Sequence, residues 1–112
     1  MNNYNIGMKG QNVAEEYLIK QNMKIILHNY RSKHGEIDLI ALDGEYIVFI
    51  EVKYRSSLKY GSPAEAVGFY KQQRIIKTAQ YYLYTHGRSN SDIRFDVIEV
   101  LGETINHIKN AF

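Results

Sequence analysis

The spacing of apolar and polar residues predicts alternating helices and strands. Apolar residues recur at helical spacing from Gly10 to Asn22, which predicts a first helix. A second helix is predicted from about Ala64 to Tyr84, and its buried side would carry Ile75, Ile76, Ala79, Tyr82 and Leu83. Short runs rich in branched residues predict strands at residues 24–30, 35–42, 45–54, 93–100 and, more weakly, 104–108.

This order of elements predicts an α/β fold, with a central mixed sheet of about five strands flanked by helices. The apolar run from Ile47 to Ile50 is typical of a central strand that is buried on both faces. A chain of 112 residues fits one domain, and we expect residues 1–112 to form it.

The pair Asp43-Gly44 predicts a two-residue type I′ turn between the second and third strands. That turn would place Asp38 opposite Phe49 and Glu36 opposite Glu51. One face of the hairpin would then carry Glu36, Asp38, Glu51 and Lys53. The other face would carry Ile37, Leu39, Val48, Ile50 and Val52.

Two acids on this hairpin are candidate metal ligands. As diagonal neighbours, Asp38 and Glu51 would lie about 7 to 8 Å apart at the backbone, and both side chains could bind one Mg²⁺ or Mn²⁺. Lys53, two residues beyond Glu51, could orient a water molecule or neutralise charge on a phosphate. An acid two residues before a lysine is also a common pattern on half-exposed strands. The clustering favours a metal, because neighbouring carboxylates repel each other unless a cation holds them.

Charge is distributed unevenly along the chain although the net charge is only +2. Residues 53–91 hold seven basic residues and one acid, whereas residues 1–52 hold five basic residues and seven acids. Such a basic segment suits a phosphate-binding surface, and a solvated helix is the alternative. The candidate phosphate contacts are Arg55, Lys71, Arg74 and Lys77. Tyr54, Tyr60 and Tyr70 lie near them in sequence and could stack on unpaired bases.

Composition excludes several kinds of site. The chain has no cysteine, so disulfides, thiolate metal sites and cysteine nucleophiles are excluded. The longest clear apolar run, Tyr46 to Ile50, is too short to span a bilayer. We therefore expect a cytoplasmic protein without a membrane partner.

Two segments, GEIDLIA at residues 35–41 and FIEVKYR at residues 49–55, resemble the YraN family of small bacterial proteins. The resemblance covers nearly the whole chain and continues at residues 7–10, 29–31, 60–63 and 94–97. That family is similar to archaeal Holliday-junction resolvases and to the PD-(D/E)xK nucleases. The resemblance implies a restriction-endonuclease-like fold in which Asp38 and Glu51 bind the metal and Lys53 is catalytic.

The chain departs from the family pattern at the start of the first helix. The family usually carries a glutamate after the glycine at this point, whereas Gln11 follows Gly10 here. Glu15 lies one helical turn later and could replace that glutamate, or it could simply face solvent. Gln11, Glu15 and Glu36 are therefore possible accessory residues.

The leading hypothesis is a metal-dependent nuclease that hydrolyses phosphodiester bonds of DNA, which we expect to be branched or otherwise structured. DNA is favoured over RNA, and a homodimer could grip a symmetric junction. The alternative is a non-catalytic nucleic-acid-binding protein with a decayed site, of which Gln11 would be a sign. A third class is a protein-interaction module that docks through the tyrosines and the basic helix.

Overall fold

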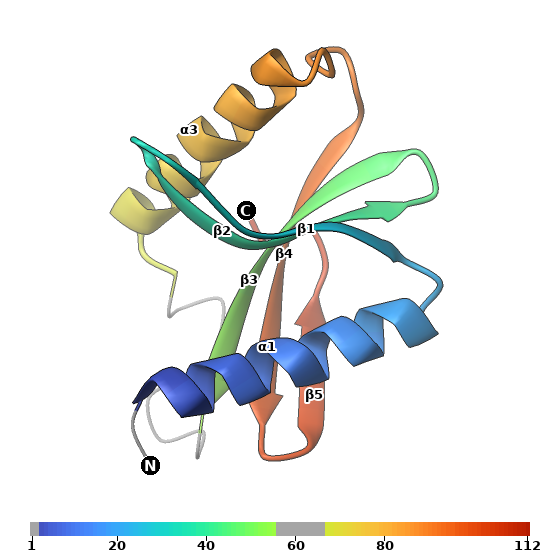
Figure 1. Ribbon diagram of the computed structural model, residues 1–112, viewed down its shortest axis with the longest axis vertical. Helices are drawn as coiled ribbons and strands as arrows, with labels where there is room; N and C mark the ends of the chain where they lie inside the picture. Colours follow the sequence, from blue (N-terminus) through green and yellow to red (C-terminus); the bar gives the residue numbers. More distant parts are fainter. Residues whose placement is uncertain (1–2, 56–66) are drawn as a thin grey trace.

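The computed structural model describes residues 3–55 and 67–112, and within the first helix it describes side chains from Gly10 onward. The described elements are α1 (Asn3–Lys20), β1 (Lys24–Ser32), β2 (Gly35–Asp43), β3 (Tyr46–Arg55), α3 (Phe69–Thr85), β4 (Ile93–Leu101) and β5 (Thr104–Ile108) (Figure 1). This order confirms the predicted α/β fold.

The five strands form one sheet in the order β1-β2-β3-β4-β5. Only β3 and β4 pair in parallel, and the chain between them includes α3, as a parallel crossover requires. The strand at the centre is β3, and every residue from Ile47 to Ile50 is buried. The prediction of a mixed sheet with a doubly buried central strand is therefore confirmed.

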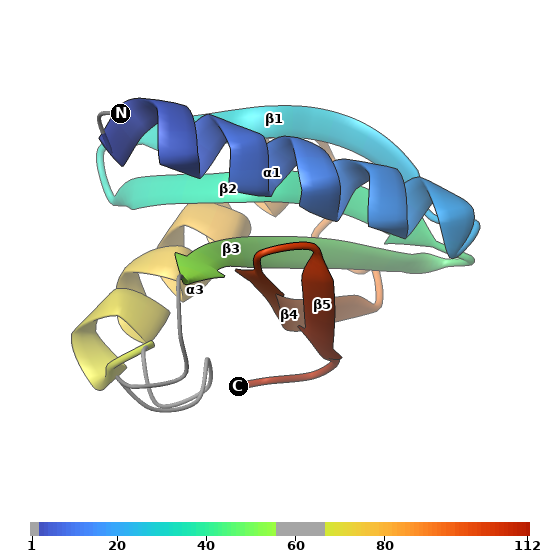
Figure 2. The ribbon, with the colours of Figure 1, turned by 90° about the horizontal axis from the view of Figure 1, so that it is seen from below.

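The helices cover opposite faces of the sheet (Figure 2). Successive side chains of a strand point to opposite faces, so Val48 and Ile50 pack on the α1 side and Phe49 packs on the α3 side. The α1-side core also contains Ala14, Leu18, Leu39, Ile98 and Val100. The α3-side core also contains Ile40, Ile75, Ala79, Leu83 and Val97.

Both helices start away from their predicted positions. Helix α1 begins at Asn3, seven residues before the predicted start at Gly10. The apolar residues before Gly10 alternate with polar ones and do not recur at helical spacing, so the sequence did not mark this earlier start. Helix α3 begins at Phe69 rather than Ala64, and the extended backbone of Gly68 caps it. Residues 67 and 68 are not helical, and 64–66 lie outside the described residues.

The buried side of α3 differs from the prediction at one position. Thr78 is fully buried and Ile76 is only half-buried, although Ile75, Ala79, Tyr82 and Leu83 are buried as predicted. The hydroxyl of Thr78 donates to the Arg74 carbonyl at 2.8 Å, which satisfies it inside the core.

The β2–β3 turn corrects the predicted hairpin register by two residues. Asp43 pairs with Tyr46, so the turn residues are Gly44 and Glu45 rather than Asp43 and Gly44. Only Gly44 has a positive φ, at 61°, whereas a type I′ turn needs two such residues. A shift of two residues leaves the faces unchanged, so Glu51 still points to the same side as Phe49.

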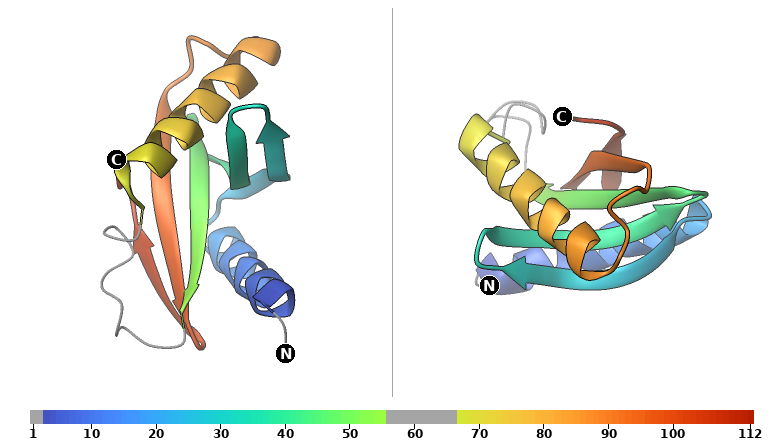
Figure 3. Two further views of the ribbon diagram at one scale, coloured as in Figure 1. Left: turned by 90° about the vertical axis from the view of Figure 1, so that its left-hand side faces the viewer. Right: turned by 90° about the horizontal axis from the view of Figure 1, so that it is seen from above.

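The outer half of the β1–β2 hairpin turns toward α3 (Figure 3). The register shifts between Ile25 and Leu27, and Asn29 has a φ of 51°, so β1 is irregular at both points. Ile37 consequently packs in the α3-side core and not beside Leu39, which corrects its predicted face.

A buried polar cluster holds β5 against β4. The fully buried carboxylate of Asp96 accepts hydrogen bonds from Arg94 Nε at 2.9 Å, His107 Nε2 at 2.7 Å and the Asn110 backbone N–H at 3.0 Å. Burial alone would raise the pKa of Asp96, but the hydrogen bonds from His107 and Arg94 outweigh it and hold this pKa below its usual value.

We expect Asp96→Ala to lower the free energy of unfolding by about 3 to 5 kcal/mol, because it leaves the Arg94 guanidinium half-paired in a largely buried position. Urea unfolding at neutral pH measures this change. Asp92→Ala removes an exposed acid from the preceding loop and is the matched control. Equal unfolding curves for the two variants would contradict a supporting role for the cluster.

Candidate functional site

The site lies where β2 separates from β3. The pairing between these strands ends at Leu39 and Ile50. The next β3 amide that points toward β2 is that of Val52, and it donates to Asp38 Oδ2 at 2.8 Å. The Asp38 side chain thus takes the position that a strand carbonyl would otherwise fill. In this register Asp38 lies one residue before Leu39 and Glu51 lies one residue after Ile50, so the two acids lie opposite each other. Their backbones are therefore closer than in the diagonal arrangement that the sequence predicted.

Burial and the neighbouring acid determine the charge state of Asp38. Burial, followed by the negative charge of Glu51, raises the pKa of Asp38 from 3.8 to about 7, although the Val52 hydrogen bond works in the opposite direction. Glu51 itself is 7% exposed. A half-buried and a buried acid in this position are stable together only if a proton or a cation offsets their charge.

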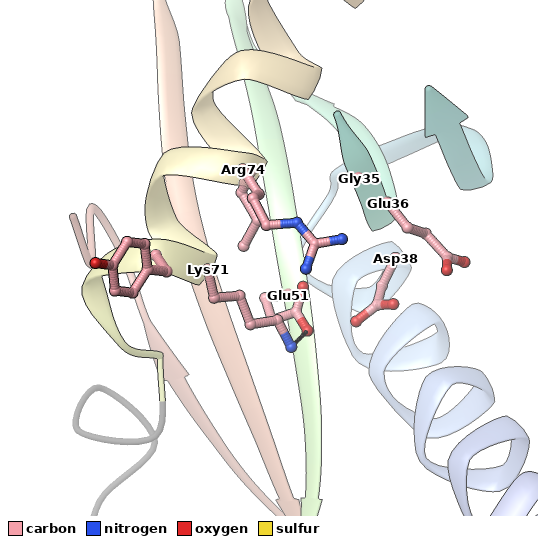
Figure 4. A pocket seen from close by; sticks show the side chains of 8 residues that line it. Gly35, Glu36, Asp38, Glu51, Lys71 and Arg74 are labelled. Carbon is pink, nitrogen blue, oxygen red and sulfur yellow. Dashed lines mark ion pairs between the residues drawn. The ribbon is translucent and has the colours of Figure 1, made fainter. Parts of the chain in front are cut away.

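Two lysines lie against Glu51. Lys71 Nζ on α3 is 2.7 Å from Glu51 Oε1 (Figure 4). Lys53 Nζ on β3 is 3.5 Å from the same oxygen. Burial and the neighbouring Lys71 ammonium lower the pKa of Lys53. For Lys71, burial is opposed by the hydrogen bond to Glu51, and the pKa is raised. Lys71 therefore keeps its positive charge to a higher pH than Lys53 does.

A pocket of about 490 Å³, which we call the carboxylate pocket, opens beside these groups. Its lining residues are Gly35, Glu36, Asp38, Glu51, Tyr70, Lys71, Arg74 and Ile75 (Figure 4). The acids come from β2 and β3, and the cations come from α3. The pocket thus combines hard oxygen ligands with groups that bind a phosphate.

The β1–β2 hairpin forms the pocket's second wall because it approaches α3 closely. A Cβ added to Gly35 would lie 3.3 Å from Thr78 Oγ1, which leaves little room for a side chain. Arg74 Nε also donates to the His34 carbonyl at 3.3 Å. These contacts direct the remainder of the Arg74 guanidinium over the two acids (Figure 4).

The structure brings five of the ten predicted site residues together. Asp38, Glu51 and Lys53 adjoin one another, and Lys71 and Arg74 join them from α3. Other candidates lie elsewhere. Lys77 is exposed farther along α3. Glu36 lines the rim, but its side chain points away from Asp38 toward Arg31, at 3.4 Å (Figure 4).

Arg55, a candidate phosphate contact in the sequence, pairs with an acid on the neighbouring strand. Its guanidinium Nε lies 3.2 Å from Glu99 Oε1 on the neighbouring strand β4, and both side chains are largely buried. Because β3 is the central strand, Arg55 is not an edge residue and does not line the carboxylate pocket.

The accessory candidates on α1 lie on the side of the sheet opposite α3. Glu15 contacts His28 of β1 at 2.8 Å. Gln11 follows Gly10, where an added Cβ would lie 3.0 Å from the Tyr54 ring. Among the described residues, no three His, Asp or Glu side chains form a group that could hold a metal ion. A metal here would have two protein carboxylates, Asp38 and Glu51.

The contact between Lys71 and Glu51 was not predicted. The sequence marked Lys71 only as a phosphate contact, and Lys71 lies 20 positions after Glu51. Its early position on a helix that follows the acid strand was the only available signal. The closeness of Gly35 to α3 likewise depends on how the hairpin bends, which no local pattern specifies.

Comparison with known proteins identifies similar chains in several bacteria. The profile of the "Uncharacterised protein family UPF0102" matches residues 10–100. A UPF0102 protein of Clostridioides difficile (strain 630) is 50% identical over 114 residues, covering 100% of both chains. One from Caldanaerobacter subterraneus subsp. tengcongensis is 45% identical, covering 100% of this chain and 98% of its own. One from Rhodococcus jostii (strain RHA1) is 44% identical, covering 98% of each chain. Within residues 3–55 and 67–112, neither helix is long and apolar enough to cross a membrane.

The raised pKa of Asp38 predicts a pH dependence of stability. Between about pH 4 and pH 7 the unfolded chain loses this proton while the folded chain keeps it, so the free energy of unfolding falls as the pH rises. Asp38→Asn keeps a hydrogen-bond acceptor for Val52 and removes the titration. From pH 5 to pH 8 we expect the variant to gain on the order of 1 to 4 kcal/mol relative to the original protein.

Urea unfolding in EDTA at both pH values measures this gain, and Asp92→Asn on an exposed loop is the control. If Asp38→Asn and the original protein change in parallel with pH, Asp38 does not titrate in this range.

Proposed function

The chain belongs to the uncharacterised protein family UPF0102, the YraN family, and from this premise we propose that it is a metal-dependent nuclease that hydrolyses phosphodiester bonds of DNA. The family description names no activity, so support for the proposal comes from the side chains. The central observation is that Asp38 and Glu51 adjoin each other in a pocket whose opposite wall carries Lys71 and Arg74. We favour branched or otherwise structured DNA as the substrate.

The donor set suits Mg²⁺ or Mn²⁺. Mg²⁺ is commonly held by one or two carboxylates, with waters and substrate phosphates as its remaining ligands. Asp38 and Glu51 would supply these carboxylates, and a bound cation would relieve the repulsion that, after burial, raises the pKa of Asp38. A bound divalent ion would act as a Lewis acid toward the phosphate and lower the pKa of a coordinated water.

The remaining residues have separate roles in the proposed hydrolysis. Water attacks phosphorus, the bond to the 3′-oxygen breaks, and a proton must reach that leaving oxygen. Lys53 adjoins Glu51 and has a lowered pKa, so it is suited to orient the attacking water or exchange a proton with it. Arg74, whose Nε donates to the His34 carbonyl, can present its terminal nitrogens to a phosphate.

One observation favours a second candidate, a nucleic-acid-binding protein without catalysis. The Lys71 ammonium lies 2.7 Å from Glu51 Oε1 and already neutralises one of the two carboxylates. An ammonium in that position competes with a metal ion for the same oxygen. If Lys71 keeps its place, the pocket binds phosphate through its cations and does not cleave it.

The nuclease proposal predicts distinct effects of three substitutions. Asp38→Asn and Glu51→Gln should each abolish metal-stimulated cleavage without unfolding the protein, because each removes a negative ligand but little volume. Lys53→Ala should keep metal binding and lose turnover. Single-stranded, flap and four-way DNA with Mg²⁺, Mn²⁺ or EDTA form the assay panel. Glu36→Gln changes a rim acid that points away from Asp38 and should cut normally. Cleavage by all variants at the original rate would reveal a contaminant and refute the assignment.

Removal of the competing ammonium separates the two candidates. Lys71→Ala should tighten Mg²⁺ binding roughly tenfold, because Glu51 then keeps its full charge for the metal. Calorimetric titration measures the affinity, and Lys77→Ala, which removes an exposed lysine from the same helix, should leave it unchanged. Metal binding only after Lys71→Ala favours the non-catalytic candidate, whereas binding by both proteins favours the nuclease. Equal affinities would show that Lys71 does not compete.

A further inference from the structure

Five side chains on the outer side of α3 lie along one line. They are Tyr70, Arg74, Lys77, Tyr81 and Tyr84, and we call this set the α3 stripe. Their spacing of four, three, four and three residues keeps them on one helix face. All five are exposed, with the tyrosines at 84%, 45% and 79% in chain order. At 1.5 Å per residue the stripe is about 21 Å long.

The α3 stripe carries aromatic and positively charged side chains but no acid. It offers three aromatic rings and two cations, and no aspartate or glutamate occurs anywhere in α3. Large aromatic side chains this exposed are costly on a surface that meets only water. Two adjacent cations with rings on both sides of them match a polyanion that also has flat apolar groups.

The α3 stripe begins at the carboxylate pocket. Tyr70 and Arg74 belong to both, because they line the pocket and also open the stripe. From there the helix runs along the outside of the sheet, so a long ligand in the pocket can continue over Lys77 toward Tyr84 (Figure 3). The site is therefore an extended track and not an isolated hollow.

We propose that the α3 stripe binds an unpaired nucleic-acid strand and leads it into the carboxylate pocket; this inference rests on the proposed function and specifies its substrate class. Bases in a duplex are stacked on each other, whereas unpaired bases expose faces on which tyrosine can stack. Arg74 and Lys77 bind the phosphates between those bases. The favoured substrate has a single-stranded segment, such as a flap or a free end.

A second copy of the chain fits this surface less well. If two copies packed α3 against α3, Arg74 and Lys77 of each would approach cations of the other. Neither helix carries an acid that could pair with them. Like charges brought together in this way oppose association, whereas a phosphate backbone supplies the missing opposite charge.

The test separates ring stacking from charge and from cleavage. The double variant Tyr81→Leu with Tyr84→Leu removes two rings but keeps apolar side chains, and Tyr81→Phe with Tyr84→Phe keeps the rings. Fluorescence anisotropy in EDTA measures binding to oligo-dT, to oligo-U and to a blunt DNA hairpin. Neither tyrosine lines the carboxylate pocket, and Tyr46→Leu, at a tyrosine 46% exposed beside the β2–β3 turn, is the surface control.

We expect the leucine pair to weaken single-strand binding by at least roughly tenfold, because the stacking of bases on two of the three rings is lost. The phenylalanine pair and Tyr46→Leu should bind as the original protein does, and affinity for the hairpin should change less than twofold. Ring-dependent binding to either oligonucleotide supports the proposal, and the preferred one identifies the sugar.

The inference is overturned if the leucine pair binds single strands normally, if it loses hairpin binding equally, or if the original protein binds no single strand. A dimer that the leucine pair dissociates in sedimentation, with no single-strand binding, would assign the stripe to a second copy. None of these readings needs a metal or cleavage, so ring-dependent binding without nuclease activity would refute the proposed function and leave the stripe intact. Cleavage without ring-dependent binding would do the reverse.

Discussion

Two carboxylates held next to each other with little access to water are the constraint on which the site depends. Asp38 and Glu51 meet because the pairing of β2 with β3 ends at Leu39 and Ile50, and the side chain of Asp38 then accepts the hydrogen bond that the β2 backbone does not. Their repulsion requires a positive charge nearby, and α3 supplies it through Lys71. The positions of α3, the β1–β2 hairpin and β3 thus all depend on compensating the charge of these two carboxylates.

The sheet separates this charged side from a second polar cluster whose chemistry differs. On the α3 side, acids and cations stand at an open pocket and are only partly matched. On the opposite face, beside β4 and β5, Asp96 is enclosed by Arg94, His107 and the Asn110 amide, so each of its oxygens has a partner. A fully satisfied buried network stabilises structure, whereas an incompletely satisfied one is available to a ligand.

The sequence predicted the site's strands and faces because alternation along a strand is a local property. Even with the turn wrongly placed, an error of two residues preserved which face carried Glu51 and Lys53. Features that depend on bending or on distant packing were not predictable. The swing of Ile37 toward α3 follows from irregularities in β1. The pairing of Arg55 with Glu99, and that of Glu15 with His28, requires knowing which elements become neighbours.

The hydrogen bond from Val52 to Asp38 makes one backbone amide an internal reporter of the pocket. Most amides of β3 face a strand carbonyl, whose charge never changes, but the Val52 amide faces a group that gains or loses a proton near neutral pH. Its proton resonance therefore follows the ionisation of Asp38 directly, and a cation that withdraws electron density from that carboxylate shifts the same resonance. Isotope labelling of valine makes this resonance observable, so the protein reports the titration of its own pocket without a substrate or an attached dye.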